Sequence, residues 1–127
     1  TFSDADGATR KQRDLEIVLT TTLDVFCENN AIKHIHFLKI DAEGSDLSIL
    51  KGAEYLLSTN DVDFIQVEAG ICSDNASHVP LCDFSSHLGP LGYELFGRYD
   101  QVEQRKSGST ALRRVNAVFV SQPSARI

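Results

Sequence analysis

One short stretch decides the fold: Lys39-Ile40-Asp41-Ala42-Glu43-Gly44-Ser45-Asp46. An apolar run ends here in carboxylates and a glycine, and a helical pattern begins directly afterwards. In an open α/β sheet, ligands bind beyond the carboxyl ends of the strands. An acidic cluster at a strand exit therefore has a chemical reason to be there, and its neighbours must show whether it binds a ligand or only caps a helix.

Composition predicts one globular domain. The 127 residues include 42% hydrophobic and 24% charged residues, which suffices for one core and leaves little room for a second. No apolar run reaches the length of a membrane span. The net charge of −6 disfavours nucleic acid and anionic membranes as partners, because both attract basic surfaces. We expect a single domain over residues 1–127, with residues 1–14 and 121–127 flexible.

The cysteines and the first residues bear on the compartment. Cys27, Cys72 and Cys82 have neither a paired nor a C-x-x-C spacing, so a disulfide framework or a structural zinc site is not expected. The polar segment from Thr1 to Gly7 lacks the basic and apolar regions of a secretory signal. These features favour a reducing, cytoplasmic location.

Apolar periodicity predicts two strands joined by a helix. Residues His34–Ile40 carry apolar side chains on both faces, which is typical of a central strand covered on both sides. Ser45 is a credible N-cap for the following helix, and Gly52 within that helix is expected to allow close approach to the sheet. Val62–Glu68 is the second strand, and the helical crossover makes the pair parallel. Both strands then deliver acids to one edge, namely Asp41, Glu43 and Glu68.

The flanking segments carry weaker signals. β-branched residues from Leu15 to Thr22 predict a strand, and Thr22 can cap a short helix after it. Ala69–Pro80 is small and polar, and we expect a loop that carries substrate contacts.

The last third of the chain predicts a helix and a strand pair. The helix starts near Leu81 and stops at Gly89-Pro90 or Gly92. Tyr93–Tyr99 and Val115–Val120 are then two strands separated by a charged connection, and such a connection most simply makes them antiparallel.

The histidines can be interpreted as metal ligands or as ordinary residues at the start of a strand. His34 and His36 point to the same face of their strand, which could suggest ligation. No third ligand lies close to them in the sequence, so we favour two histidines at a strand's start without a metal. His78 and His87 are interpreted as surface residues.

Four segments occur together in this chain: Leu38-Lys39-Ile40-Asp41-Ala42-Glu43-Gly44, Leu50-Lys51-Gly52-Ala53, Thr21-Thr22-Leu23-Asp24 and Ile65-Gln66-Val67-Glu68. In this combination the sequence resembles the FkbM-like family of S-adenosylmethionine-dependent methyltransferases, from Leu15 to Val120. The resemblance implies an α/β fold with a Rossmann-like methyltransferase sheet. Such a sheet is mainly parallel and has an antiparallel strand pair at its carboxyl end.

One departure from the family pattern changes the expectation. Family members begin with a strand and a glycine-rich turn that holds the methionyl part of the cofactor, and no G-x-G-like turn precedes Asp41 here. The chain therefore looks like the carboxyl-terminal half of such an enzyme, lacking the first strands. A half-sheet exposes the edge next to the His34 strand. We predict a homodimer through that edge or a rearranged sheet.

The resemblance also implies roles for the acids. Asp41 and Glu68 are the candidate catalytic residues, and Asp41, Glu43 and Gly44 are the candidate cofactor contacts. An ordinary carboxylate is far too weak a base to deprotonate an alcohol, so Asp41 is expected to orient a hydroxyl unless burial raises its pKa. Structural alternatives stay open: a helix-dipole contact for Glu43, a tight turn for Gly44 and a hydrogen-bonded structural acid for Glu68.

Three classes of function are compatible with the sequence. The first is an S-adenosylmethionine-dependent O-methyltransferase that acts on a hydroxyl of a sugar, glycan or secondary metabolite. The second is a non-catalytic fragment or interaction module that retains the fold without binding the cofactor. The third is a protein that binds magnesium or calcium through the acidic strand ends. We favour the first and expect no metal.

Overall fold

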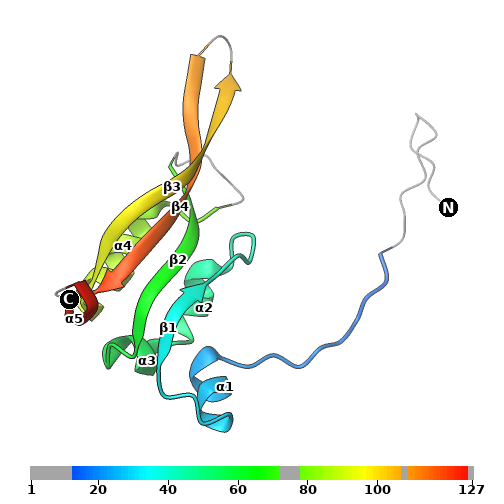
Figure 1. Cartoon of the computed structure of the whole chain (residues 1–127). Helices are drawn as coiled ribbons and strands as arrows, with labels where there is room; N and C mark the ends of the chain where they lie inside the picture. The colour runs from blue at the N-terminus through cyan, green and yellow to red at the C-terminus, as the bar shows by residue number, and fades with distance from the viewer. Residues whose placement is uncertain (1–12, 72–77, 107–108, 126–127) are drawn as a thin grey trace.

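The computed structural model describes residues 13–71, 78–106 and 109–125 (Figure 1). Its helices and strands occur in the following order: α1 (Leu23–Asn29), β1 (Ile35–Lys39), α2 (Asp46–Lys51), α3 (Glu54–Ser58), β2 (Val62–Gly70), α4 (Leu81–Leu88), the 3-10 helix η1 (Gly89–Leu91), β3 (Tyr93–Lys106), β4 (Ser109–Ser121) and α5 (Gln122–Ala125). The α/β class is confirmed. The segment expected as a carboxyl-terminal tail contains α5 and begins with Ser121, the buried last residue of β4.

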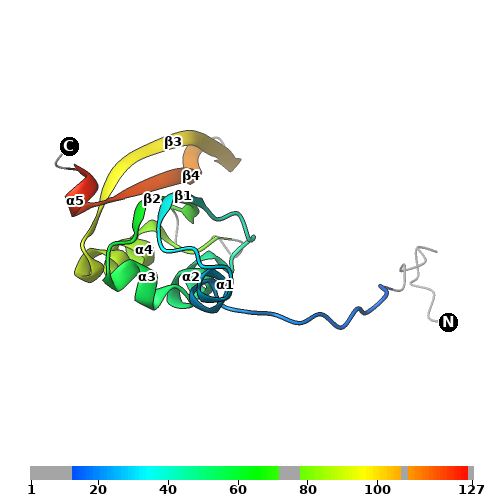
Figure 2. The ribbon, with the colours of Figure 1, turned by 60° about the horizontal axis from the view of Figure 1, so that its bottom comes forward.

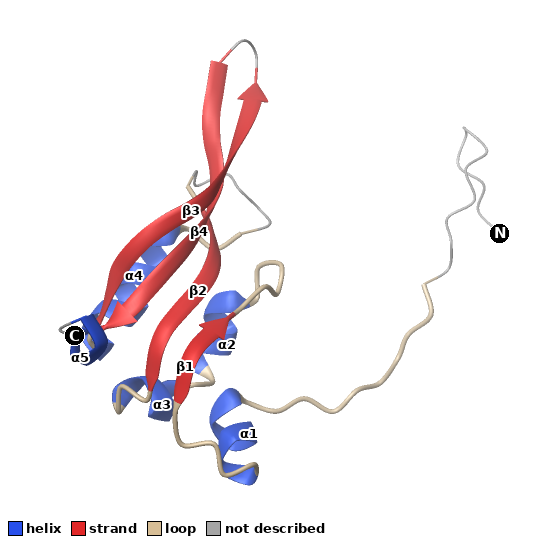
Figure 3. Ribbon diagram, viewed as in Figure 1, coloured by secondary structure: helices blue, strands red, loops and turns tan. Residues whose placement is uncertain are grey.

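The sheet has four strands in the order β1-β2-β4-β3 (Figure 3). The predicted parallel pair is confirmed, with Ile35 opposite Val62 and Leu38 opposite Ile65. The prediction of a mainly parallel sheet is wrong, because β4 pairs antiparallel with both β2 and β3. The physical reason is that β3 and β4 form a hairpin, which is necessarily antiparallel, and its second strand inserts beside β2.

The hairpin is longer than predicted. Lys106 pairs with Ser109 at its far end, so the charged stretch that was assigned to a connection belongs to β3 and β4; residues 107–108 between them lie outside the described chain. β2 stops pairing at Gly70, opposite Arg114. Beyond this point the hairpin extends away from the sheet as a two-stranded ribbon (Figure 1). The sequence of this segment shows no apolar alternation, and this is why the pattern missed it.

The strand predicted over Leu15–Thr22 is wrong. Residues 13–22 form no helix or strand, and Ile17 is 99% exposed. β-branched residues favour strands only where a neighbouring strand accepts them, and none lies beside this part of the described chain. The predicted cap is confirmed: Thr22 Oγ1 accepts a hydrogen bond from Val25 N at 3.2 Å and opens α1.

Helices α1 to α4 gather on one side of the sheet (Figure 2). The core lies between the two layers, and complete burial of one of its large apolar side chains contributes about 1.5–3 kcal/mol. Its largest fully buried apolar members include Leu50, Leu57, Ile65, Val67, Phe84 and Phe119. β1 is an edge strand on which Phe37 is 52% exposed. The prediction of a central strand covered on both faces is therefore wrong, since the helices cover one face only.

The expected helix after Ser45 is divided at Gly52 into α2 and α3. Gly52 does permit a close approach, but to α1 and not to the sheet: a Cβ there would lie 3.3 Å from Thr22 Cβ. Asp24 joins the same elements, because its carboxylate accepts hydrogen bonds from Tyr55 N at 2.8 Å and Leu56 N at 3.1 Å. Asp24 thus caps α3, whose own N-cap residue makes no side-chain hydrogen bond.

Two further observations concern the helices and the cysteines. In the part of the chain that the structure describes, no helix has the length and apolar character needed to cross a membrane. Cys27 is a buried free thiol and Cys82 an exposed one, while Cys72 lies outside the described residues. Burial, reinforced by the nearby Asp24 carboxylate, raises the pKa of the Cys27 thiol.

Candidate functional site

The predicted convergence of acids at one sheet edge is confirmed. Because β1 and β2 are parallel, their carboxyl ends reach the same edge of the sheet. Asp41 and Glu43 follow β1, and Glu68 lies two residues before the end of β2. One carboxylate oxygen from each of the three lies within 4.8 Å of the others. Asp41 and Glu43 are exposed, whereas Glu68 is half-buried.

The turn between β1 and α2 adopts an unusual backbone. Glu43 has φ +49° and Gly44 has φ +100°, so two consecutive residues have positive φ. The structure thereby confirms a backbone role for Gly44, because an L-residue rarely adopts this conformation. Ser45 N donates to Ala42 O at 3.2 Å and closes the turn. Glu43 is a non-glycine residue at positive φ, a strained conformation that surrounding contacts must offset.

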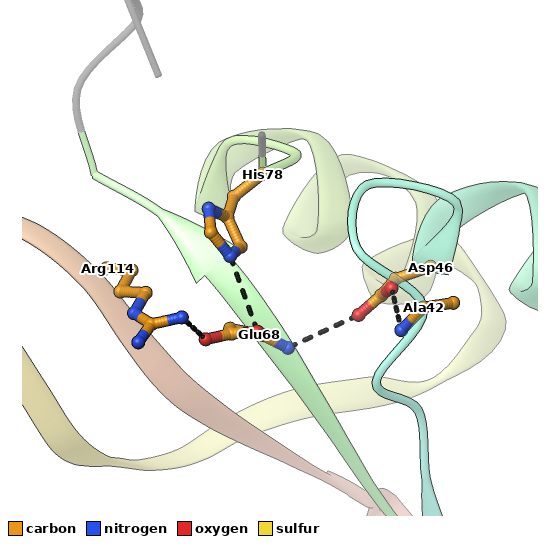
Figure 4. A network of polar contacts seen from close by, with 5 residues as sticks. All are labelled: Ala42, Asp46, Glu68, His78 and Arg114. Atoms are coloured by element: carbon orange, nitrogen blue, oxygen red, sulfur yellow. Dashed lines mark hydrogen bonds and ion pairs between the residues drawn. The ribbon is translucent and has the colours of Figure 1, made fainter. Parts of the chain in front are cut away.

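A buried carboxylate fastens this turn to β2 (Figure 4). Asp46 Oδ1 accepts a hydrogen bond from Ala42 N at 3.0 Å, and Asp46 Oδ2 accepts one from Glu68 N at 3.4 Å. The Asp46 side chain is only 2% exposed. The sequence indicates for Asp46 only a place in the first helical turn and predicts Ser45 as the N-cap of α2, but Ser45 makes no side-chain cap hydrogen bond. Asp46 instead holds the Asp41–Gly44 turn against the strand that carries Glu68.

Glu68 is held from two sides (Figure 4). Arg114 Nη1 donates to Glu68 Oε1 in an ion pair, and His78 Nε2 lies 3.3 Å from Glu68 Oε2. The Arg114 guanidinium compensates the charge of a carboxylate that is 16% exposed. Both oxygens of Glu68 are therefore engaged by the protein, which leaves Asp41 and Glu43 as the acids of this edge that face solvent.

Neither partner of Glu68 was found by sequence reasoning. His78 was interpreted as a surface residue, but it is buried, because the chain returns beside β2 with Gly70 N donating to Val79 O at 2.8 Å. Residues 72–77 of this loop lie outside the described chain. Arg114 lies opposite Gly70, one diagonal step from Glu68 on the same face of the sheet. Only the register of β2 against β4 could have identified it.

The three acids are also the residues of this edge that could bind a metal ion. Their oxygens are close enough to bind a hard cation such as magnesium or calcium. However, Arg114 and His78 already contact the two oxygens of Glu68. A divalent cation placed there would also be repelled by the Arg114 guanidinium. These two contacts leave Glu68 less available as a metal ligand than Asp41 and Glu43.

A second cluster lies at the opposite end of the parallel pair. His34 Nε2 and His36 Nδ1 are each 3.0 Å from Asp63 Oδ2. The prediction that the two histidines share a face is confirmed. A third ligand type does lie close in space, because Asp63 comes from the neighbouring strand β2 and not from the local sequence.

A comparison of the sequence with known protein families gives a match. A family model described as the methyltransferase FkbM domain matches residues 2–89. The match covers more than half of the chain and includes β1, β2 and the three acids of the edge, but not Arg114. A search of curated proteins and a search of solved structures each returned no match.

Proposed function

The chain belongs to the FkbM methyltransferase family, and from this premise we propose that it serves S-adenosylmethionine-dependent methyl transfer to a hydroxyl group of a sugar, a glycan or a secondary metabolite. One observation carries the proposal: two exposed carboxylates, Asp41 and Glu43, meet Glu68 at the carboxyl edge of the parallel pair. This edge is where open α/β sheets bind their ligands.

The chemistry of the edge fits the charged part of the cofactor. S-adenosylmethionine, when bound, supplies an electrophilic methyl group on a positively charged sulfur. The carboxylates of Asp41 and Glu43 suit that charge, and Gly44 offers backbone without a side chain at φ +100°. We assign these three residues to cofactor contact. No glycine-rich turn precedes Asp41 in this chain, so we assign no residue to the adenosine part.

Asp41 and Glu68 have different proposed roles at the acceptor. Asp41 is exposed and can accept a hydrogen bond from an incoming hydroxyl, which orients the hydroxyl oxygen for attack. Glu68 is held by Arg114 and His78, so we propose that it acts as a carboxylate of fixed position at the strand end, with its charge balanced by Arg114. The loop between β2 and α4 begins beside this edge, and we propose that it supplies acceptor contacts.

The cofactor assignment is tested by comparing two ligands that differ in charge. Isothermal titration calorimetry measures S-adenosylmethionine, which carries the sulfonium, and S-adenosylhomocysteine, which does not. If the carboxylates contact the sulfonium, Asp41→Asn and Glu43→Gln weaken the binding of the first ligand more than that of the second. Asp83→Asn serves as the matched control, because Asp83 is an exposed acid on α4. Equal weakening of both ligands would contradict the assignment.

The catalytic assignment needs a separate measurement. Transfer of a labelled methyl group to a panel of hydroxyl compounds is expected to fall at least about 100-fold in Asp41→Ala if this residue orients the acceptor, while S-adenosylhomocysteine binding persists. Full activity in Asp41→Ala would remove Asp41 from the mechanism. Absence of binding heat with either ligand would favour the alternative, a non-catalytic module that retains the fold.

A further inference from the structure

The amino end of the β1–β2 pair carries a set of metal-type ligands that the proposed methyl transfer does not use. We propose that His34, His36 and Asp63 bind a divalent transition-metal ion of the zinc class. His34 Nε2 and His36 Nδ1 each lie 3.0 Å from Asp63 Oδ2. One donor atom from each residue lies within 4.8 Å of the other two.

The backbone places these donors without help from a ligand. Ile35 pairs with Val62 and Phe37 with Phe64, so His36 lies opposite Asp63 on the neighbouring strand. Ile35 N donates to Asp61 O at 2.8 Å and fixes the start of the pair. His34 is two residues from His36, and residues two apart in an extended chain point to the same face. His36 and Asp63 lie on adjacent strands of one sheet and His34 directly precedes β1, and donors on strands are better ordered than donors on loops.

The two imidazole rings meet edge to face. Their ring centroids are 4.9 Å apart with an interplanar angle of 66°, so neither ring covers the face of the other. Two ligands of a tetrahedral zinc ion are about 3.3 Å apart when each metal bond is about 2.0–2.1 Å long. The observed separations of 3.0 Å from the Asp63 oxygen require only a small opening of the cluster. His36 is 88% exposed, which provides an entry path.

The donor set selects the class of ion. Two imidazole nitrogens and one carboxylate oxygen suit zinc, copper, nickel or iron, whereas magnesium and calcium prefer oxygen ligands throughout. Three protein ligands leave a coordination position for water or for a side chain of another molecule. The site therefore differs in chemistry from the acidic edge formed by Asp41, Glu43 and Glu68.

The position of the site predicts what the ion would do. It lies at the amino ends of β1 and β2, whereas the acids of the methyl-transfer edge lie at the carboxyl ends. The ion would link the edge strand β1 to β2 through side chains, in addition to the backbone hydrogen bonds of the ladder. Ion binding to the folded state alone stabilises that state by mass action. The consequence is a stabilised sheet edge without direct participation in catalysis.

The test uses zinc chloride as the only probe and the chain without an affinity tag. Calorimetry of the unaltered chain is expected to show one zinc ion bound. Nitrogen NMR of the histidine rings is expected to show metallation of His34 at Nε2 and of His36 at Nδ1. Binding is expected to weaken at least about tenfold in His36→Ala and in Asp63→Asn. Both substitutions keep the backbone pairing, which circular dichroism and urea unfolding of the variants check.

Two control variants separate this site from the other candidates. His87→Gln removes a histidine from α4, and Glu43→Gln alters the acidic edge; zinc affinity is expected to be unchanged in both. Loss of zinc binding in Glu43→Gln would place the ion at the acidic edge and overturn the proposal. So would wild-type affinity in folded His36→Ala and Asp63→Asn, or an unaltered chain that binds no zinc.

Discussion

Replacement of Asp46 by alanine removes the contact that fastens the Asp41–Gly44 turn to β2. In the folded chain the Asp46 carboxylate accepts hydrogen bonds from Ala42 N at 3.0 Å and Glu68 N at 3.4 Å while being 2% exposed. The alanine methyl group cannot accept either hydrogen bond. Both amide groups then lose their partner in a part-buried region, and each unsatisfied group destabilises the folded state.

The expected loss of stability follows from the two contacts. A hydrogen bond to a charged group contributes about 1.5–3 kcal/mol, and the longer contact to Glu68 N counts for less because its distance exceeds the usual range. We therefore expect Asp46→Ala to lower the free energy of unfolding by about 2–4 kcal/mol. Asp46→Asn keeps the shape and one acceptor oxygen, and it should lose about 1–2 kcal/mol.

Urea unfolding followed by far-ultraviolet circular dichroism measures these losses, since the chain has no tryptophan for fluorescence. Asp83→Ala is the matched control: Asp83 is also an acid in the first turn of a helix, α4, but it is exposed. It reports the helix-dipole contribution alone. If the midpoint and slope for Asp46→Ala equal those for Asp83→Ala, the clamp between the turn and β2 contributes nothing and the reasoning is refuted.

Three further predictions rest on other parts of the structure. Gly44→Ala should destabilise the fold by about 1–3 kcal/mol, because alanine is strained at positive φ. In Gly89→Ala the added methyl group meets open space, so this variant should not be destabilised. Equal thermal melting temperatures of the two variants would contradict this. Burial raises the pKa of Tyr93 from 10.0 to about 12, and its neutral phenol donates a hydrogen bond to Val62 O. The neutral phenol therefore stabilises the fold fully below pH 10, and this contribution is lost as the pH rises toward 12. The difference in unfolding free energy between the wild type and Tyr93→Phe should accordingly shrink by about 1.4 kcal/mol per pH unit in this window, and a constant difference would disprove the assignment. Finally, the exposed edge of β1 is the proposed pairing site for a second copy; sedimentation should reveal a concentration-dependent dimer, and a persistent monomer with β1 folded would argue against it.

Local features of the fold could be predicted because neighbouring residues determine them. The strand, turn and helix around Asp41, the Thr22 cap and the parallel pairing of β1 with β2 depend on spacing and on a short helical crossover. The meeting of Asp41, Glu43 and Glu68 follows from that pairing alone. The family resemblance rests on the same segments. The strand predicted from Leu15 shows the limit of such patterns, because propensity without a partner strand forms no sheet.

The sequence by itself thus determined which acids lie at the edge, and only the tertiary structure decided what surrounds them. Arg114 reaches Glu68 because β4 inserts between β2 and β3, and Asp63 joins His34 and His36 because β2 lies beside β1. Asp46, at the start of α2, joins the turn to β2 through the amide of Glu68, which is 22 residues further along the chain. Each of these contacts joins residues far apart in the chain, and their partners are set by strand order and register, which no local pattern encodes.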